Sequence, residues 1–224
     1  MALADILSAL ERDYGKPRPP STSDPLEMIL WENVAYLVPD ARREAAFRAL
    51  VEQIGLEPDA IRSAPYEALR EIAELGGMLP DQRVLKLRTI AEIAAREFPG
   101  GLRAALKQPL PRAKAALRRF PGIGEPGAEK ILLFSRTAPI LALESNGLRV
   151  LVRLGYGQES RNYAATYRSV RAAVAGEIVS DCTWLIRAHQ LLRRHGQERC
   201  KAKQPYCGEC RVAASCAYWR NRPS

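Results

Sequence analysis

Four cysteines near the C-terminal end constrain the fold of this chain more than any other feature. They are Cys200, Cys207, Cys210 and Cys216, spaced C-x6-C-x2-C-x5-C in the stretch CKAKQPYCGECRVAASC. Four thiolates so close in sequence can surround one soft metal centre with little intervening chain. Disulfides are disfavoured, because the total of five cysteines is odd and the N-terminus lacks the pattern of a secretory signal.

The residues alone leave two kinds of metal centre open. Zinc and an iron–sulfur cluster both suit four thiolates, although the tail has one C-x2-C pair where zinc ribbons commonly have two. The fifth cysteine, Cys182, lies on the apolar face of a predicted helix, so we expect a buried core thiol. His189 and His195 lack ligand spacing to each other, and we expect them to pack or to bond to backbone groups.

The rest of the chain predicts helices and no strands. Leu, Ala, Arg and Glu dominate its 224 residues, and β-branched residues never form alternating runs. A Pro/Ser linker over residues 16–25 follows an amphipathic N-terminal helix, and no apolar run is long enough to span a membrane. Further helices are expected at 25–37, 40–54, 66–75, 82–97, 110–119, 127–136, 144–154, 160–175 and 181–195.

Positive charge is concentrated in the second half of the chain. Residues 1–100 contain 12 Lys or Arg and 17 Asp or Glu, whereas residues 101–224 contain 22 and 8. A polyanion would therefore meet the second half first. From charge alone, two interpretations are equally supported: a basic surface that is simply solvated, and a surface that binds nucleic acid.

The stretch RFPGIGEPG predicts a tight turn between two helices. Gly122 and Gly124 allow the backbone to approach a phosphate, and the next helix directs its N–H groups and positive dipole end at it. Alone, such a turn is more often an ordinary helix connection, but its basic surroundings favour a phosphate clamp. Glu125 does not fit a clamp unless its carboxylate turns away. The predicted contacts are Gly122, Ile123, Gly124, Pro126, Gly127 and Lys130.

The cysteine tail, with the preceding AHQLLRRHGQERC, resembles the iron–sulfur loop of the endonuclease III family of helix-hairpin-helix DNA glycosylases. FPGIG resembles the hairpin of that family, commonly LPGVG, and the similarity covers about residues 25–219. The resemblance implies an all-α fold of two lobes with a DNA groove between them. One lobe is a helical barrel over 25–141 that ends in the hairpin, and the other holds the cluster and combines 1–24 with 142–224.

The resemblance also implies a cofactor and a partner. The cofactor is a [4Fe–4S] cluster on the four tail cysteines, and the partner is double-stranded DNA bound by a cytoplasmic, nucleoid-associated monomer. DNA contacts on the cluster loop are expected from Arg199, Lys201, Lys203 and Arg211.

The stretch LESNGLRV resembles LDGNVKRV of the adenine-mispair members of the family more closely than VDTHVFRV of endonuclease III. Glu144 then stands where the family has a catalytic aspartate, which stabilises the positive charge that develops on the sugar. The longer side chain would displace that carboxylate by roughly 1 Å. The alternative is that Glu144 only offsets the dipole of the following helix. Asn146, shared with LDGNVKRV, is expected in the pocket.

A second carboxylate and several apolar side chains complete the predicted site. An ungapped match places Glu32 where adenine-mispair glycosylases have a buried general acid, and an exposed glutamate is the alternative. Trp31 or Tyr36 would stack on an extruded base. In the family, the wedge that fills the space left by the flipped nucleotide is commonly glutamine, and in this chain Leu37 or Val38 occupies that position. Met78 or Leu79 in LGGMLPD is a second candidate wedge.

The Schiff-base lysine of the bifunctional members aligns with Pro126, so we expect no lyase chemistry of the usual type. The predicted function is a monofunctional DNA glycosylase that flips a damaged or mispaired base and hydrolyses its N-glycosidic bond. One alternative is a protein that binds damaged DNA without base release. The other is an abasic-site lyase that uses Lys130, one helical turn beyond Pro126, although a DNA-contacting lysine explains that residue more simply.

Overall fold

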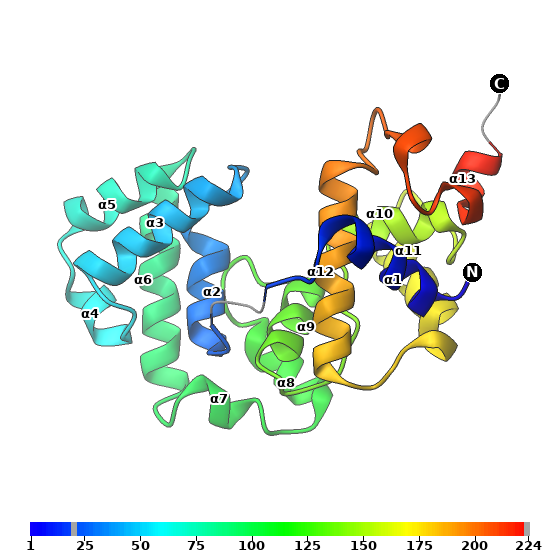
Figure 1. Cartoon of the computed structure of the whole chain (residues 1–224). Helices are drawn as coiled ribbons and strands as arrows, with labels where there is room; N and C mark the ends of the chain where they lie inside the picture. Colours follow the sequence, from blue (N-terminus) through cyan, green and yellow to red (C-terminus); the bar gives the residue numbers. More distant parts are fainter. Residues whose placement is uncertain (19–21, 222–224) are drawn as a thin grey trace. The chain divides into compact units, whose positions relative to one another are not determined.

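The computed structural model describes residues 1–18 and 22–221, and every regular element within them is a helix (Figure 1). The predicted all-α fold is therefore confirmed. The chain forms two compact units: Met1–Pro20 with Pro139–Ser224, which we call the cysteine unit, and Ser21–Ala138, which we call the hairpin unit. Part of the predicted linker, residues 19–21, lies outside the described residues.

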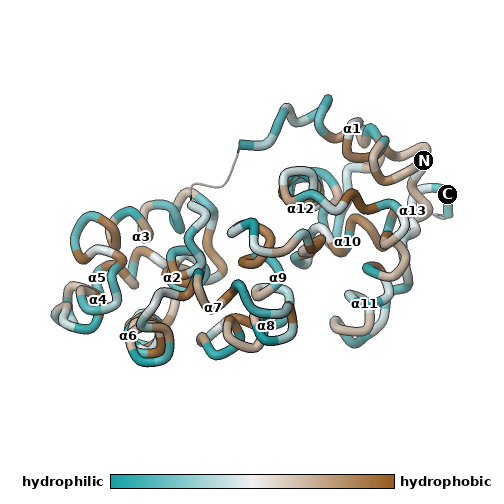
Figure 2. The backbone as a smooth tube through the Cα atoms, turned by 90° about the horizontal axis from the view of Figure 1, so that it is seen from below, coloured by the Kyte–Doolittle hydropathy of each residue, from teal (hydrophilic) through white to brown (hydrophobic). Residues whose placement is uncertain are grey.

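The hairpin unit is built around α6 (Pro80–Glu97), which packs against α2 (Pro25–Val34), α4 (Pro58–Ser63) and α5 (Tyr66–Leu75). Hydrophobic and hydrophilic positions alternate along these helices (Figure 2), and fully buried side chains such as Ile29 and Leu87 form the core. Asp24 caps the N-terminus of α2, because its carboxylate accepts N–H bonds from the first turn. The remaining helices are α3 (Asp40–Gln53), α7 (Leu102–Ala105), α8 (Leu110–Leu117) and α9 (Glu125–Phe134).

The cysteine unit is centred on α12 (Cys182–Glu198), which packs against α1 (Leu3–Tyr14) and α10 (Ser145–Leu154). The N-terminal helix thus joins the C-terminal part of the chain in one unit. The unit also contains α11 (Tyr163–Val174), α13 (Ala217–Arg220) and three 3-10 turns, η1 (Ala175–Glu177), η2 (Cys207–Glu209) and η3 (Ala213–Ser215).

Two expectations about local structure were wrong. The helix expected to reach residue 37 ends at Val34, because Ala35 is extended and the N–H of Tyr36 bonds instead to the carbonyl of Gly76 at 3.1 Å. Cys182 is half-buried at the first position of α12, where it does not belong to the core. Among the described residues, no helix combines the length and the apolar character needed to cross a bilayer.

Candidate functional site

The turn between α8 and α9 has the hairpin geometry expected from its glycines. Gly122 adopts φ +76°, which favours glycine, and a Cβ atom there would lie 2.9 Å from Oδ1 of the buried Asn33, which would have to shift. The predicted contacts Gly122, Ile123 and Gly124 lie in the turn, and Pro126, Gly127 and Lys130 lie in the first two turns of α9. Ile123 is buried, and its N–H donates to the carbonyl of Phe120 at 3.2 Å within the turn.

The carboxylate of Glu125 turns away from the hairpin backbone. Its Oε1 lies 2.6 Å from the Nζ of Lys114 on α8, and its Oε2 lies 3.8 Å from Arg118. The same Nζ lies 2.5 Å from Oε1 of Glu129, which is buried. Burial lowers the pKa of Lys114, but the bonds to both glutamates outweigh burial and raise it. Lys114 therefore fastens the two hairpin helices together and removes the conflict between Glu125 and a phosphate clamp.

Glu32 on α2 forms an ion pair with Lys130 on α9. Its Oε1 lies 2.5 Å from Nζ, and the two side chains are 31% and 30% exposed. Glu32 is therefore not the buried, solvent-free carboxylate that the general-acid role suggested. Lys130 is likewise not an isolated amine, because its ammonium group forms this ion pair with Glu32 within the hairpin unit.

Two loops of the hairpin unit, residues 35–38 and 76–79, bring exposed apolar side chains together; we call them the apolar loop pair. Tyr36, Leu37, Met78 and Leu79 are 64%, 75%, 68% and 62% exposed. Leu37 and Leu79 also adopt positive φ angles of 53° and 59°, which are uncommon for leucine and mark strained positions. The loops touch through Gly76, where a Cβ would lie 2.0 Å from the carbonyl oxygen of Val34.

Trp31 is less available than Tyr36 for stacking on a base. Its ring packs edge-on against Phe47 of α3, with the ring centres 5.2 Å apart, and the guanidinium of Arg43 lies 6.0 Å from its centre. Arg43 also donates to the carbonyl of Trp31 at 2.9 Å. Trp31 is thus fixed against α3, while Tyr36 extends from the apolar loop pair.

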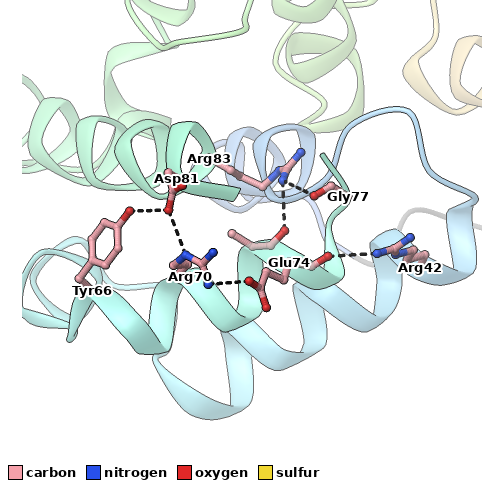
Figure 3. Close-up of polar contacts among 8 residues, drawn as sticks. Arg42, Tyr66, Arg70, Glu74, Gly77, Asp81 and Arg83 are labelled. Carbon is pink, nitrogen blue, oxygen red and sulfur yellow. Dashed lines mark hydrogen bonds and ion pairs between the residues drawn. The ribbon is translucent and has the colours of Figure 1, made fainter. Parts of the chain in front are cut away.

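A buried arginine that the sequence reasoning missed organises the second loop of this pair. Arg83 is 5% exposed and donates to the carbonyls of Ala73 and Met78 at 3.1 and 2.9 Å. It also donates to the carbonyl of Gly77 at 3.4 Å (Figure 3). Burial lowers the pKa of Arg83, and the charges of Arg43 and Arg42 lower it further. No sequence signal separates this arginine from the exposed ones around it, since its burial depends on how α5 and α6 pack.

In the cysteine unit, Glu144 is the N-cap of α10. Its Oε1 accepts the backbone N–H of Gly147 at 2.6 Å, and its Oε2 accepts the side-chain amide of Asn146 at 2.8 Å. Arg149 donates to Oδ1 of Asn146 at 2.8 Å and to the carbonyls of Gly196 and Cys200 at 2.7 and 2.9 Å. A continuous chain of hydrogen bonds therefore connects Glu144 with the start of the cysteine loop.

The four tail cysteines line one cavity, together with Val150, His195, Tyr206 and Trp219 among others. Burial raises the pKa of Cys210, and the neighbouring Cys200, Cys216 and Cys207 raise it further by repulsion between thiolates. Within residues 1–18 and 22–221, no three His, Cys, Asp or Glu side chains are close enough to hold a single metal ion. The four cysteines that line the cavity nevertheless supply thiolates, which are the ligands that soft metal centres such as iron–sulfur clusters use.

The predicted cationic contacts near the cysteines differ in their surroundings. Arg199 forms an ion pair with Glu209, and Arg211 lies 3.6 Å from Asp13. Nζ of Lys201 lies 5.0 Å from the centre of the Tyr206 ring, and Lys203 is exposed. Arg153, which sequence reasoning missed, donates to the carbonyls of Lys201 and Ala202 at 2.8 and 2.9 Å and so shapes this loop.

No family model matches the chain. Proteins named endonuclease III do match it. The protein from Thermotoga maritima is 23% identical over 97% of this chain and 95% of its own length. The Sulfolobus acidocaldarius protein is 24% identical over 78% and 73%, and that of Rickettsia prowazekii is 30% identical over half of each chain.

Three solved structures show the same fold. A trapped covalent intermediate of endonuclease III with DNA has a TM-score of 0.75 at 18% identity, covering 97% of this chain and 95% of its own. A thermostable thymine-DNA glycosylase has a TM-score of 0.76 at 17% identity, covering 98% and 95%. The Helicobacter pylori 3-methyladenine DNA glycosylase bound to 1,N6-ethenoadenine has a TM-score of 0.67 at 15% identity, covering 88% and 98%.

Proposed function

We infer the activity from one premise: the chain belongs to the endonuclease III-like family of helix-hairpin-helix DNA glycosylases. It is a DNA glycosylase of this type, and we propose that it releases bases by hydrolysis without a lyase step. The observation that carries this proposal is that the chain has both a carboxylate at Glu144, the N-cap of α10, and a proline at position 126. Base hydrolysis needs a negative charge that stabilises the developing sugar cation, and the carboxylate of Glu144 supplies it. Strand cleavage needs an amine that attacks the sugar, and Pro126 has none.

The hairpin unit would hold the DNA. The turn around Gly122 and the N-terminus of α9 bind a backbone phosphate through N–H groups, and this contact is independent of sequence. Leu37, Met78 and Leu79 of the apolar loop pair enter the base stack where the target nucleotide has left it. Tyr36 lies beside them and offers a ring for stacking.

Glu144 would stabilise the reaction's charged transition state. Departure of the base leaves positive charge on the deoxyribose, and a fixed carboxylate lowers the energy of that charge. Bonds from Gly147 and Asn146 orient the carboxylate, and each oxygen retains a further lone pair for a water molecule. A carboxylate held in this way is arranged before the substrate arrives.

The same structure supports the absence of a lyase step. A lyase needs an unprotonated amine that attacks C1′ of the sugar, and Pro126 has none. Lys130 lies on the same helix, but its ammonium is bound to the carboxylate of Glu32 at 2.5 Å. Glu32 would act on the leaving base only after this pair opens, so its role as general acid stays a proposal.

We also propose that Cys200, Cys207, Cys210 and Cys216 hold a [4Fe–4S] cluster, on the evidence of their shared cavity. Bound there, the cluster would cross-link residues 200–216 and provide a one-electron redox centre. Protein purified without oxygen is expected to contain about four irons per chain. Zinc without iron in elemental analysis would contradict this assignment.

A second candidate function is binding of damaged DNA without base release. The observation that favours it is that both oxygens of Glu144 are engaged within the chain, as expected for a carboxylate that serves only to cap α10. DNA binding by the hairpin would be the same in both cases, so binding measurements alone do not separate the two.

The test is a panel of duplexes that carry uracil, oxidised pyrimidines, alkylpurines, mispaired adenine or an abasic site. We expect base release from at least one substrate, strand breakage only after alkali, and no covalent adduct with borohydride. Breakage without alkali, or a trapped adduct that Lys130→Ala abolishes, would show the lyase instead. No base release from any substrate would favour the binding protein.

A further inference from the structure

His195 connects the N-terminal helix to one of the tail cysteines. It lies on α12 and is 2% exposed. Its Nδ1 is 2.8 Å from the hydroxyl oxygen of Tyr14, the last residue of α1, and its Nε2 is 3.6 Å from Sγ of Cys210. The imidazole thus joins two segments that are almost 200 residues apart in sequence.

A thiolate at Cys210 favours the tautomer of His195 that carries its proton on Nε2, because the other tautomer would direct a lone pair of Nε2 at the sulfur. The hydroxyl of Tyr14 then donates to Nδ1. A tyrosine hydroxyl donates one hydrogen, and when it donates to Nδ1 the neutral ring must carry its own hydrogen on Nε2. A doubly protonated ring also carries a hydrogen on Nε2. In both of these forms Nε2–H is the donor that faces Sγ of Cys210.

Tyr14 is itself held in place from two sides. The guanidinium of Arg194 lies 4.9 Å from the centre of the Tyr14 ring and donates to its carbonyl oxygen at 2.8 Å. One turn earlier on α1, Glu11 accepts two bonds from Arg187 of α12 at 3.0 and 2.8 Å. The end of α1 is therefore fixed on α12, which a tyrosine needs if it is to orient a buried imidazole.

We propose that Tyr14 is a positioning residue for the cluster: through His195 it directs an N–H bond at the thiolate of Cys210. This inference rests on the proposed cluster. An N–H donor takes up part of the negative charge on a ligand thiolate, which slows loss of the metal and stabilises the more reduced cluster. The N-terminal helix would thereby contribute to cluster stability without supplying a ligand.

The experiment compares Tyr14→Phe with Tyr156→Phe in the full iron-loaded protein. Tyr156 also belongs to the cysteine unit, but its hydroxyl donates to Glu177 at 3.1 Å, so its removal controls for loss of a hydrogen-bonded hydroxyl. Iron release to an added chelator is followed by visible absorption, and the cluster potential is measured by redox titration. We expect Tyr14→Phe to release iron about tenfold faster and to shift the potential to more negative values.

Tyr156→Phe should match the parent in both measurements. Equal iron release and equal potentials for Tyr14→Phe and the parent would overturn this inference and leave the cluster assignment intact. A parent protein without iron would overturn both. Circular dichroism of the two variants separates a general loss of structure from a local effect, because a local effect leaves the helical signal of Tyr14→Phe unchanged.

Discussion

Arg83→Met tests how the second loop of the apolar loop pair is held. The substitution keeps most of the apolar volume and removes the donor that serves the carbonyls of Ala73, Gly77 and Met78. The Ala73 carbonyl still accepts from the N–H of Gly76 at 3.0 Å. Only the carbonyls of Gly77 and Met78 therefore lose their charged donor without a replacement. Each of these two hydrogen bonds contributes about 1.5 kcal/mol, and the variant no longer has to desolvate a buried guanidinium, which offsets part of the loss. The free energy of unfolding should therefore fall by about 2 kcal/mol.

Arg42→Met is the matched control. Arg42 donates to the carbonyl of Glu74 at 3.1 Å (Figure 3) and to that of Leu75 at 2.7 Å, at the same end of α5. Arg42 is exposed, so water replaces the lost donor. Its effect should be about 0.5 kcal/mol or less. Urea unfolding followed by circular dichroism measures both variants. If the two free energies agree within error, the buried arginine does not hold the loop, and the reasoning is refuted.

Two further predictions concern DNA binding. Gly122→Ala should weaken binding to duplex DNA and lower the free energy of unfolding by about 1–2 kcal/mol, because alanine at φ +76° is strained and its Cβ meets Asn33. Gly124→Ala, with a negative φ and only Pro126 at 4.0 Å, should have little effect on stability, and equal losses would refute the argument. Charge reversal of both Lys201 and Lys203 should flatten the dependence of log K on log salt by about two units in fluorescence anisotropy titrations. An unchanged slope would exclude these two lysines as phosphate contacts.

The helical fold was predictable because its signals are local. Apolar periodicity and the glycines of the hairpin act within a few residues, so the expected bounds of most helices lie within a few positions of those in the structure. The short helices α4 and α7 were missed, because six and four residues are too few to show a period. The early end of α2 depends on the bond between Tyr36 and Gly76, which are forty residues apart.

The candidate site was less predictable because its decisive contacts cross between helices. Glu125 looked unsuited to a phosphate clamp until Lys114 of α8 proved to be its partner. Glu32 looked suited to burial, yet Lys130 and solvent share its carboxylate. In each case an ion-pair partner on another helix decides the orientation and surroundings of the carboxylate. A single sequence does not show which residue that partner is.

The most direct test of the proposed function is base release by Glu144→Gln under single-turnover conditions. The amide preserves the size of the side chain and removes the charge that would stabilise the sugar cation. We expect the rate to fall by at least about a hundredfold on any duplex that the parent processes, while the Kd for that duplex changes little. A variant that releases the base as fast as the parent would contradict the assignment of Glu144 as the catalytic carboxylate.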